Sequence, residues 1–138
     1  MKTLDLPGQI TIHDTTVREG FQREERLIPT DAKLWVVQQL VKAGFTRLEV
    51  TNFANPARLP QFADAEELLR LIRTHRSITP LLANVEFSAV TINQRAVDRA
   101  LAAHMEGHGP DRILLVISVS DAYQQANTGM GIDAYWKM

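Results

Sequence analysis

The sequence contains no cysteine, few aromatic residues and almost no net charge. Without cysteine there can be no disulfide, no thiolate metal site and no cysteine nucleophile. Fifteen Lys and Arg against sixteen Asp and Glu give a formal charge of -1, which leaves no positive field to attract nucleic acid or an acidic membrane. No apolar stretch approaches the roughly 20 residues of a membrane helix, and no signal-peptide segment is evident. We therefore expect a cytoplasmic protein without nucleic-acid or membrane partners.

Short apolar runs alternate with amphipathic segments along the 138 residues. Period-two or continuous apolar patterns predict strands near 9–13, 45–50, 81–85 and 113–119, and helical spacing predicts helices near 30–43, 64–75, 91–105 and 132–138. The apolar run of 113–119 is typical of a strand that is covered on both faces. Such repeated βα units indicate one α/β domain with a parallel sheet.

Two architectures fit this alternation, an open doubly wound sheet and a (β/α)₈ barrel. The sequence has neither a Gly-x-Gly-x-x-Gly motif after the first strand nor a Walker sequence, so the nucleotide-binding marks of the first are missing. In both architectures the carboxyl ends of the strands collect the chemistry. The polar residues expected at those ends are Arg18, Glu19, Glu49, Asn84, Ser118 and Ser120.

The motifs at these strand ends carry a family resemblance. The segment from Thr15 to Gln22 (TTVREGFQ) resembles the first signature of the metal-dependent lyase and Claisen-type synthase superfamily, which includes hydroxymethylglutaryl-CoA lyase, isopropylmalate synthase and homocitrate synthase. The 31-residue step from Arg18 to Glu49, with the segments 51–56 and 59–64, is similar to the lyase branch. The segment 118–121 and Asn127 resemble the exit of the fourth strand, so the resemblance covers nearly the whole chain.

The resemblance implies the N-terminal half of a (β/α)₈ TIM barrel, with four parallel βα units. It implies cleavage of a carbon–carbon bond in a 3-hydroxyacyl-CoA through an enolate, whose charge needs a metal ion or a guanidinium. Arg18 would be that guanidinium, and Glu49 would help to position it. Glu19 would bind a divalent metal, Mg²⁺ or Mn²⁺ with Zn²⁺ as an alternative. Gln22, Asn84 and Ser120 would contact the substrate.

Other functions remain open at this point. The Asp14-Thr15-Thr16 run and Glu19 favour a condensing synthase that acts on a 2-oxo acid, whereas the segment 55–64 favours the lyase. The family completes its metal site with a His-x-His pair on a later strand, and none of the four histidines fits that place.

Four parallel strands without closure leave two unpaired edges and an apolar face. We consider a fragment that lacks its C-terminal half-barrel, a homo-oligomer of half-barrels that could be non-catalytic, and a self-standing domain. The fragment is favoured, because the full barrel has about 250 residues.

Residue patterns also predict the surroundings of several side chains outside the main motif. His13 should be packed or hydrogen-bonded, and Trp35 should pack against a neighbouring helix. The charged residues from Arg23 to Arg26 should form a solvated cluster in the loop after the first strand.

Overall fold

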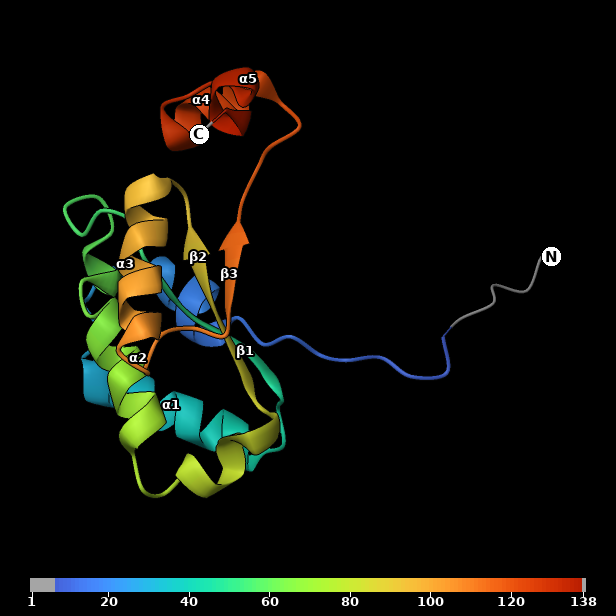
Figure 1. The fold of residues 1–138 in the computed structure, drawn as a ribbon, viewed down its shortest axis with the longest axis vertical. Coiled ribbons are helices and arrows are strands. Elements are labelled where there is room, and N and C mark those ends of the chain that lie inside the picture. Colours follow the sequence, from blue (N-terminus) through green and yellow to red (C-terminus); the bar gives the residue numbers. More distant parts are fainter. Residues whose placement is uncertain (1–6, 138) are drawn as a thin grey trace.

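Three parallel strands in one sheet form the centre of the computed structural model, which describes residues 7–137 (Figure 1). The strands are β1 (Arg47–Asn52), β2 (Glu86–Thr91) and β3 (Arg112–Leu115). The α-helices are α1 (Thr30–Lys42), α2 (Ala65–Thr74), α3 (Gln94–Met105), α4 (Asp121–Thr128) and α5 (Ile132–Trp136). Three short helical turns complete the order: a π-helical turn η1 (Thr16–Gly20), and the 3₁₀ turns η2 (Pro60–Phe62) and η3 (Thr79–Asn84).

The strands follow one another across the sheet in the order of the sequence. Asp14 forms a parallel bridge with Leu48 of β1, β1 pairs with β2, and β2 pairs with β3. An open doubly wound sheet reverses its strand order at a switch point, whereas a barrel adds each strand on the same side of the last. The observed progression is that of a (β/α)₈ barrel.

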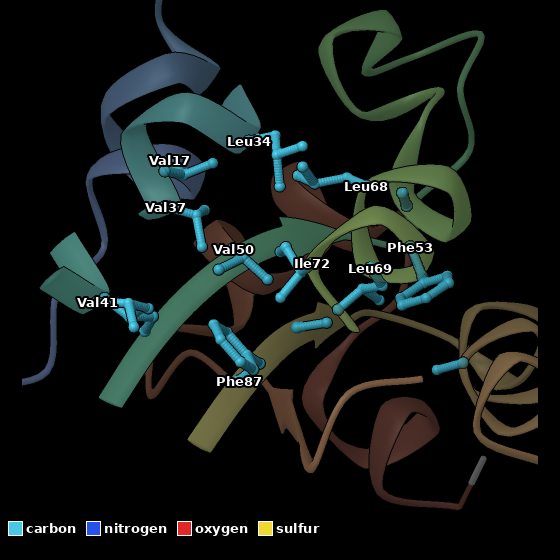
Figure 2. Close-up of a cluster of buried hydrophobic side chains, with 14 of the residues drawn as sticks. Val17, Leu34, Val37, Val41, Val50, Phe53, Leu68, Leu69, Ile72 and Phe87 are labelled. Atoms are coloured by element: carbon cyan, nitrogen blue, oxygen red, sulfur yellow. The ribbon is translucent and has the colours of Figure 1, made fainter. Parts of the chain in front are cut away.

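One apolar core joins α1, α2 and α3 to one face of the sheet (Figure 2). Leu48 and Val50 alternate along β1 and lie in this core, as Phe87 does on β2, so the residues between them point to the other face. The side chains of Val37, Leu69 and Ile72 are fully buried between helices and sheet. Burial of this common face holds the strand ends in fixed relative positions.

The helix boundaries agree with the sequence patterns for α1, α2 and α3. Gly44 follows α1 with a φ of 92°, a left-handed conformation that suits glycine and ends the helix. The side chain of Asn93 caps α3 by accepting a hydrogen bond of 2.9 Å from the backbone N–H of Ala96. Asn93 thereby fixes the path of the chain immediately after β2.

The predicted first strand, 9–13, is not formed. Residues 7–13 are exposed and belong to no strand, and pairing with β1 begins only at the Asp14 bridge. Ile10 and Ile12 are 76% and 62% exposed. The described chain offers no second layer to cover these side chains, so pairing them would bury little apolar surface. Residues 7–137 therefore form three strands and a bridge in place of the four predicted strands.

The third predicted strand begins later in the sequence than the expected range of 81–85. These residues belong to η3, which begins at Thr79 with Pro80 in its first turn, and the strand β2 follows at Glu86–Thr91. Proline suits the start of a helical turn, and Leu-Leu-Ala has little β preference. The β-branched and aromatic residues that favour a strand come later, from Phe87 to Thr91.

The last predicted strand, 113–119, is shorter and more exposed than expected. β3 ends at Leu115, and the side chains of Ile113 and Leu115 are 44% and 48% exposed. Ile113 pairs with Ala89 and lines an open hollow with Val97, Ala100 and Leu101 of α3, so α3 covers it only in part. Figure 1 shows α4 and α5 beyond the carboxyl end of β3, apart from the other helices. The helix α4 itself was not predicted.

Side chains on the outer surface differ in part from expectation. Trp35 on α1 is 60% exposed, so the predicted packing against a neighbouring helix is wrong. Residues 22–27 are all exposed, as expected for a solvated charged cluster.

Burial raises the pKa of Tyr135 in α5. Between residues 7 and 137, no helix has both the length and the apolar character that crossing a bilayer requires.

The core can be tested with two leucines of opposite burial. Leu69 is fully buried and Leu101 is 56% exposed. We expect Leu69→Ala to lower the free energy of unfolding by about 2–5 kcal/mol, because it leaves a cavity between α2 and the sheet. Leu101→Ala should lower it by less than about 1 kcal/mol. Urea unfolding followed by circular dichroism measures both, and equal losses would contradict the placement of the core.

Candidate active site at the carboxyl ends of the first strands

A tight turn carries the charged motif away from the first sheet pairing. The bridge at Asp14 consists of two backbone hydrogen bonds, 3.0 Å from Asp14 N–H to Arg47 O and 2.8 Å from Glu49 N–H to Asp14 O. The Asp14 carboxylate then accepts 3.0 Å bonds from the backbone N–H and the hydroxyl of Thr16. These bonds start η1, a π-helical turn of the kind often found at functional sites.

Within η1, Val17 anchors the turn and Arg18 faces the strand. Val17 is 1% exposed in the apolar core, and the next side chain reaches β1. The Arg18 guanidinium donates through Nε to the Glu49 carboxylate and through Nη1 to the Glu19 carboxylate. The side chains of Arg18 and Glu49 are 16% and 6% exposed, whereas Glu19 is 46% exposed. A buried carboxylate thus holds a permanent cation at a fixed place, and a more accessible carboxylate flanks it.

The electrostatics of this cluster favour a fixed orientation. A guanidinium has five N–H donors, and two of them are used by Glu19 and Glu49. The other three N–H groups have no hydrogen-bond partner among residues 7–137. Arg18 can therefore donate to an oxyanion without giving up the bonds that orient it.

Glu19 is the predicted metal ligand, and two arginines lie beside its carboxylate. Its carboxylate bonds to Arg18 and lies 3.7 Å from Nη2 of Arg23. In the described part of the chain, no three His, Asp or Glu side chains come together closely enough to hold a metal ion. Glu19 can offer one oxygen, but residues 7–137 alone do not fit a divalent metal centre.

The predicted substrate contacts are more scattered. Gln22 is exposed in the helical backbone that continues directly from η1, before the loop that leads to α1. Asn84 is exposed at the end of η3, before β2 begins, so it lies at the amino end of that strand and not at its carboxyl end. Ser120 is exposed after β3 and caps α4 by accepting a 3.4 Å bond from Tyr123 N–H. The structure brings together Arg18, Glu19 and Glu49 only.

Two residues next to this cluster had no predicted role in the site. Ser88 pairs with Glu49 in the sheet register and is 1% exposed. Its hydroxyl lies 3.1 Å from Nε2 of His13, which agrees with the expected hydrogen-bonded imidazole. The sequence pattern did not point to Ser88, because the predicted strand 81–85 ends before this residue and β2 begins at Glu86.

A groove of about 620 Å³ opens at the carboxyl ends of β1 and β2. It is lined by Phe53, Asn55 and Pro56 from the loop after β1, and by Asn93, Gln94, Arg95, Ala96 and Arg99 at the start of α3. Arg99 fixes this groove, because its guanidinium binds both oxygens of Glu66 at 2.8 Å and donates to the carbonyl of Phe53 at 3.2 Å. Arg95 is exposed on its rim.

Comparison with curated proteins finds relatives along most of the chain. No protein-family model matches. The chain is 29% identical to the cytoplasmic 3-hydroxy-3-methylglutaryl-CoA lyase of Mus musculus, over 93% of this chain and 34% of that protein. It is 31% identical to the (R)-citramalyl-CoA lyase of Chloroflexus aurantiacus, over 86% of this chain and 37% of that protein. The chain thus spans little more than a third of the length of these lyases.

Solved structures agree with the fold. The hydroxymethylglutaryl-CoA lyase of Pseudomonas aeruginosa superposes with a TM-score of 0.80 at 24% identity, over 96% of this chain and 40% of that one. The enzyme of Brucella melitensis gives a TM-score of 0.74 at 29% identity, over 92% and 41%. The chain resembles the N-terminal part of hydroxymethylglutaryl-CoA lyases, and the predicted fold class, the N-terminal part of a TIM barrel, is confirmed.

The pairing of Arg18 with Glu49 can be measured by a double-mutant cycle. We expect Arg18→Gln and Glu49→Gln each to destabilise the protein, because each leaves a largely buried charge without its partner. Together they should cost less than the sum, with a coupling of about 1–3 kcal/mol in urea unfolding. The exposed pair of Arg70 and Glu67 is the matched control and should show a coupling of no more than about 0.5 kcal/mol. Additive losses at Arg18 and Glu49 would contradict the site geometry.

Proposed function

We propose that this chain forms the first part of a lyase that cleaves a carbon–carbon bond in a 3-hydroxyacyl-CoA. The observation that carries the proposal is the oriented guanidinium of Arg18 on η1, held by buried Glu49 from the middle of β1. The relatives support a lyase, because the mouse and Chloroflexus proteins are both named as acyl-CoA lyases. A related lyase structure contains coenzyme A and 3-methylmalate.

The proposed reaction needs a positive charge beside the thioester carbonyl oxygen. A base removes the proton of the 3-hydroxyl group, the bond between C2 and C3 breaks, and its electron pair moves to the thioester carbonyl. The products are a carbonyl compound and an enolate, which is then protonated at C2. The enolate oxygen needs donors that are already oriented. Arg18 would donate to that oxygen, and Glu49 would keep the guanidinium from turning away.

The groove at the carboxyl ends of β1 and β2 is a candidate binding place for the remote part of an extended substrate. Its walls come from the loops after β1 and β2, and its rim carries the exposed guanidinium of Arg95. We propose that it accommodates part of the acyl-CoA outside the reacting centre, where binding energy can orient the thioester.

The cytoplasmic location of this protein stays a prediction, because one mouse relative is named cytoplasmic and another mitochondrial.

A divalent metal remains part of the proposal, although the described residues do not complete its site. Glu19 would supply one carboxylate oxygen, and further ligands would have to come from elsewhere in the full-length protein. A bound divalent ion supplies a positive charge that polarises a carbonyl oxygen. Mg²⁺ or Mn²⁺ suits an oxygen ligand, with Zn²⁺ as the alternative.

A condensing synthase is the second candidate, favoured by one observation at the turn. The carboxylate of Asp14 organises η1 through the backbone N–H and the hydroxyl of Thr16, and this Asp-Thr-Thr run is the feature that resembles the synthases. The same enolate would then attack a 2-oxo acid in place of being released. Assays with a 3-hydroxyacyl-CoA and with an acyl-CoA plus a 2-oxo acid separate the two reactions.

The role of Arg18 is tested by turnover in the full-length protein. We expect Arg18→Gln to lower kcat roughly 10²- to 10³-fold with the fold intact, because the oriented donor to the enolate is lost. Arg26→Gln, the same change in the exposed cluster nearby, should leave kcat unchanged. Cleavage of hydroxymethylglutaryl-CoA is measured as the rate of acetyl-CoA release. Retained turnover in Arg18→Gln would refute the proposed role.

The metal is tested by titration with Mn²⁺, read by electron paramagnetic resonance on the full-length protein. We expect saturable binding that Glu19→Gln weakens at least about tenfold, because a carboxylate ligand is lost. Glu25→Gln, a change in the same charged cluster, is the control and should bind as the parent does. A stable dimer without Mn²⁺ binding would favour the non-catalytic half-barrel instead.

A further inference from the structure

A single buried side chain binds both ends of the exposed loop that follows the π-helical turn η1. Residues 22–27 are exposed and link η1 to the start of α1. The Gln61 side chain donates through Nε2 to the carbonyls of Phe21 and Arg26, each at 3.1 Å. Its Oε1 accepts a bond of 2.9 Å from the backbone N–H of Ile28. Gln61 is 5% exposed, so these bonds are shielded from water.

Gln61 is itself held by a buried lysine. Lys33 on α1 is 2% exposed, and its ammonium donates to the backbone carbonyl of Gln61 and to both carboxylate oxygens of Asp64, at 2.8 and 3.0 Å. Asp64 also accepts a bond of 2.7 Å from the hydroxyl of Thr30. The Lys33 ammonium lies 5.7 Å from the centre of the Phe62 ring. These contacts tie α1 to the turn η2.

The chemistry of this network argues for a constrained geometry. An ammonium has three donors and no acceptor, and burying it is costly unless each donor finds a partner. Here the carbonyl of Gln61 and the carboxylate of Asp64 provide those partners. The side-chain amide of Gln61 likewise uses both N–H groups and its oxygen. The network leaves Gln61 little freedom to move away from the loop.

We propose that Gln61 is a positioning residue for Arg18 and Glu19. Phe21 ends η1 directly after Gly20, so a bond to its carbonyl fixes the end of the turn that carries both charged side chains. The backbone N–H groups of Arg18 and Glu19 donate to Thr15 O at 3.2 and 2.7 Å and report whether this turn is formed. The chemical importance of the positioning rests on the proposed function, whereas the ordering of the turn does not.

Two substitutions at Gln61 test this in the chain itself by NMR hydrogen exchange. We expect Gln61→Ala to speed exchange at the amides of Arg18, Glu19 and Ile28 roughly tenfold or more, because the bonds that close the loop are lost. Gln61→Glu retains an acceptor for Ile28 but loses both donors. It should leave the Ile28 amide protected while Arg18 and Glu19 exchange faster. In Gln61→Glu, a merely structural role would lower the protection of all three amides together.

The control is Gln124→Ala, which removes another buried glutamine that fixes a loop. Gln124 is 1% exposed, and its side chain binds Ser118 N–H and the hydroxyl of Thr128. It should leave exchange in η1 unchanged. Unchanged exchange at Arg18 and Glu19 in both Gln61 variants would overturn the proposal.

Kinetics of the full-length protein provide the second readout. We expect Gln61→Ala to lower kcat with little change in KM, because the reacting groups and not the bulk of the substrate are displaced. Faster exchange with an unchanged kcat would overturn the link between Gln61 and the site. A parent protein that fails to cleave any acyl-CoA would sink the proposed function alone, since exchange at Arg18 and Glu19 still decides whether Gln61 orders the turn.

Discussion

The ion pair between Arg18 and Glu49 is the interaction on which the site depends. It joins a turn at the start of the chain to the middle of β1, 31 residues later, and it buries a carboxylate that needs its partner. Once this pair is made, the guanidinium has one orientation and Glu19 lies beside it. The bridge at Asp14 and the anchoring of Val17 in the core place the turn so that the pair can form.

A second set of constraints acts on the same turn from the opposite side. The strand bridge fixes the entry to η1, and Gln61 fixes its exit, while Lys33 and Asp64 hold Gln61 in place. The turn therefore keeps its shape although the loop beyond it is exposed. Such support around reacting groups is what allows a cation to meet a developing charge without reorganisation.

The sequence predicts the fold better than it predicts the edges of the elements. Helical periodicity located α1, α2 and α3, because these helices bury one apolar face against a sheet that is present. The strand predicted at 9–13 does not form, and Ile10 and Ile12 stay exposed. The strand predicted at 81–85 is wrong because the apolar leucines there belong to the 3₁₀ turn η3. Motif spacing brought Arg18 and Glu49 together correctly, but it could not reveal Gln61, whose role depends on hydrogen bonds to distant backbone groups.

The state of the Arg18 guanidinium is the most direct test of this account. Nitrogen-15 NMR of arginine side chains observes the Nε–H group of Arg18 directly. We expect this proton to exchange slowly with water at neutral pH, because the bond to the buried Glu49 carboxylate protects it. In Glu49→Gln the same proton should exchange fast. Exchange as fast as that of an exposed arginine such as Arg26 would contradict the claim that Glu49 holds the cation in place.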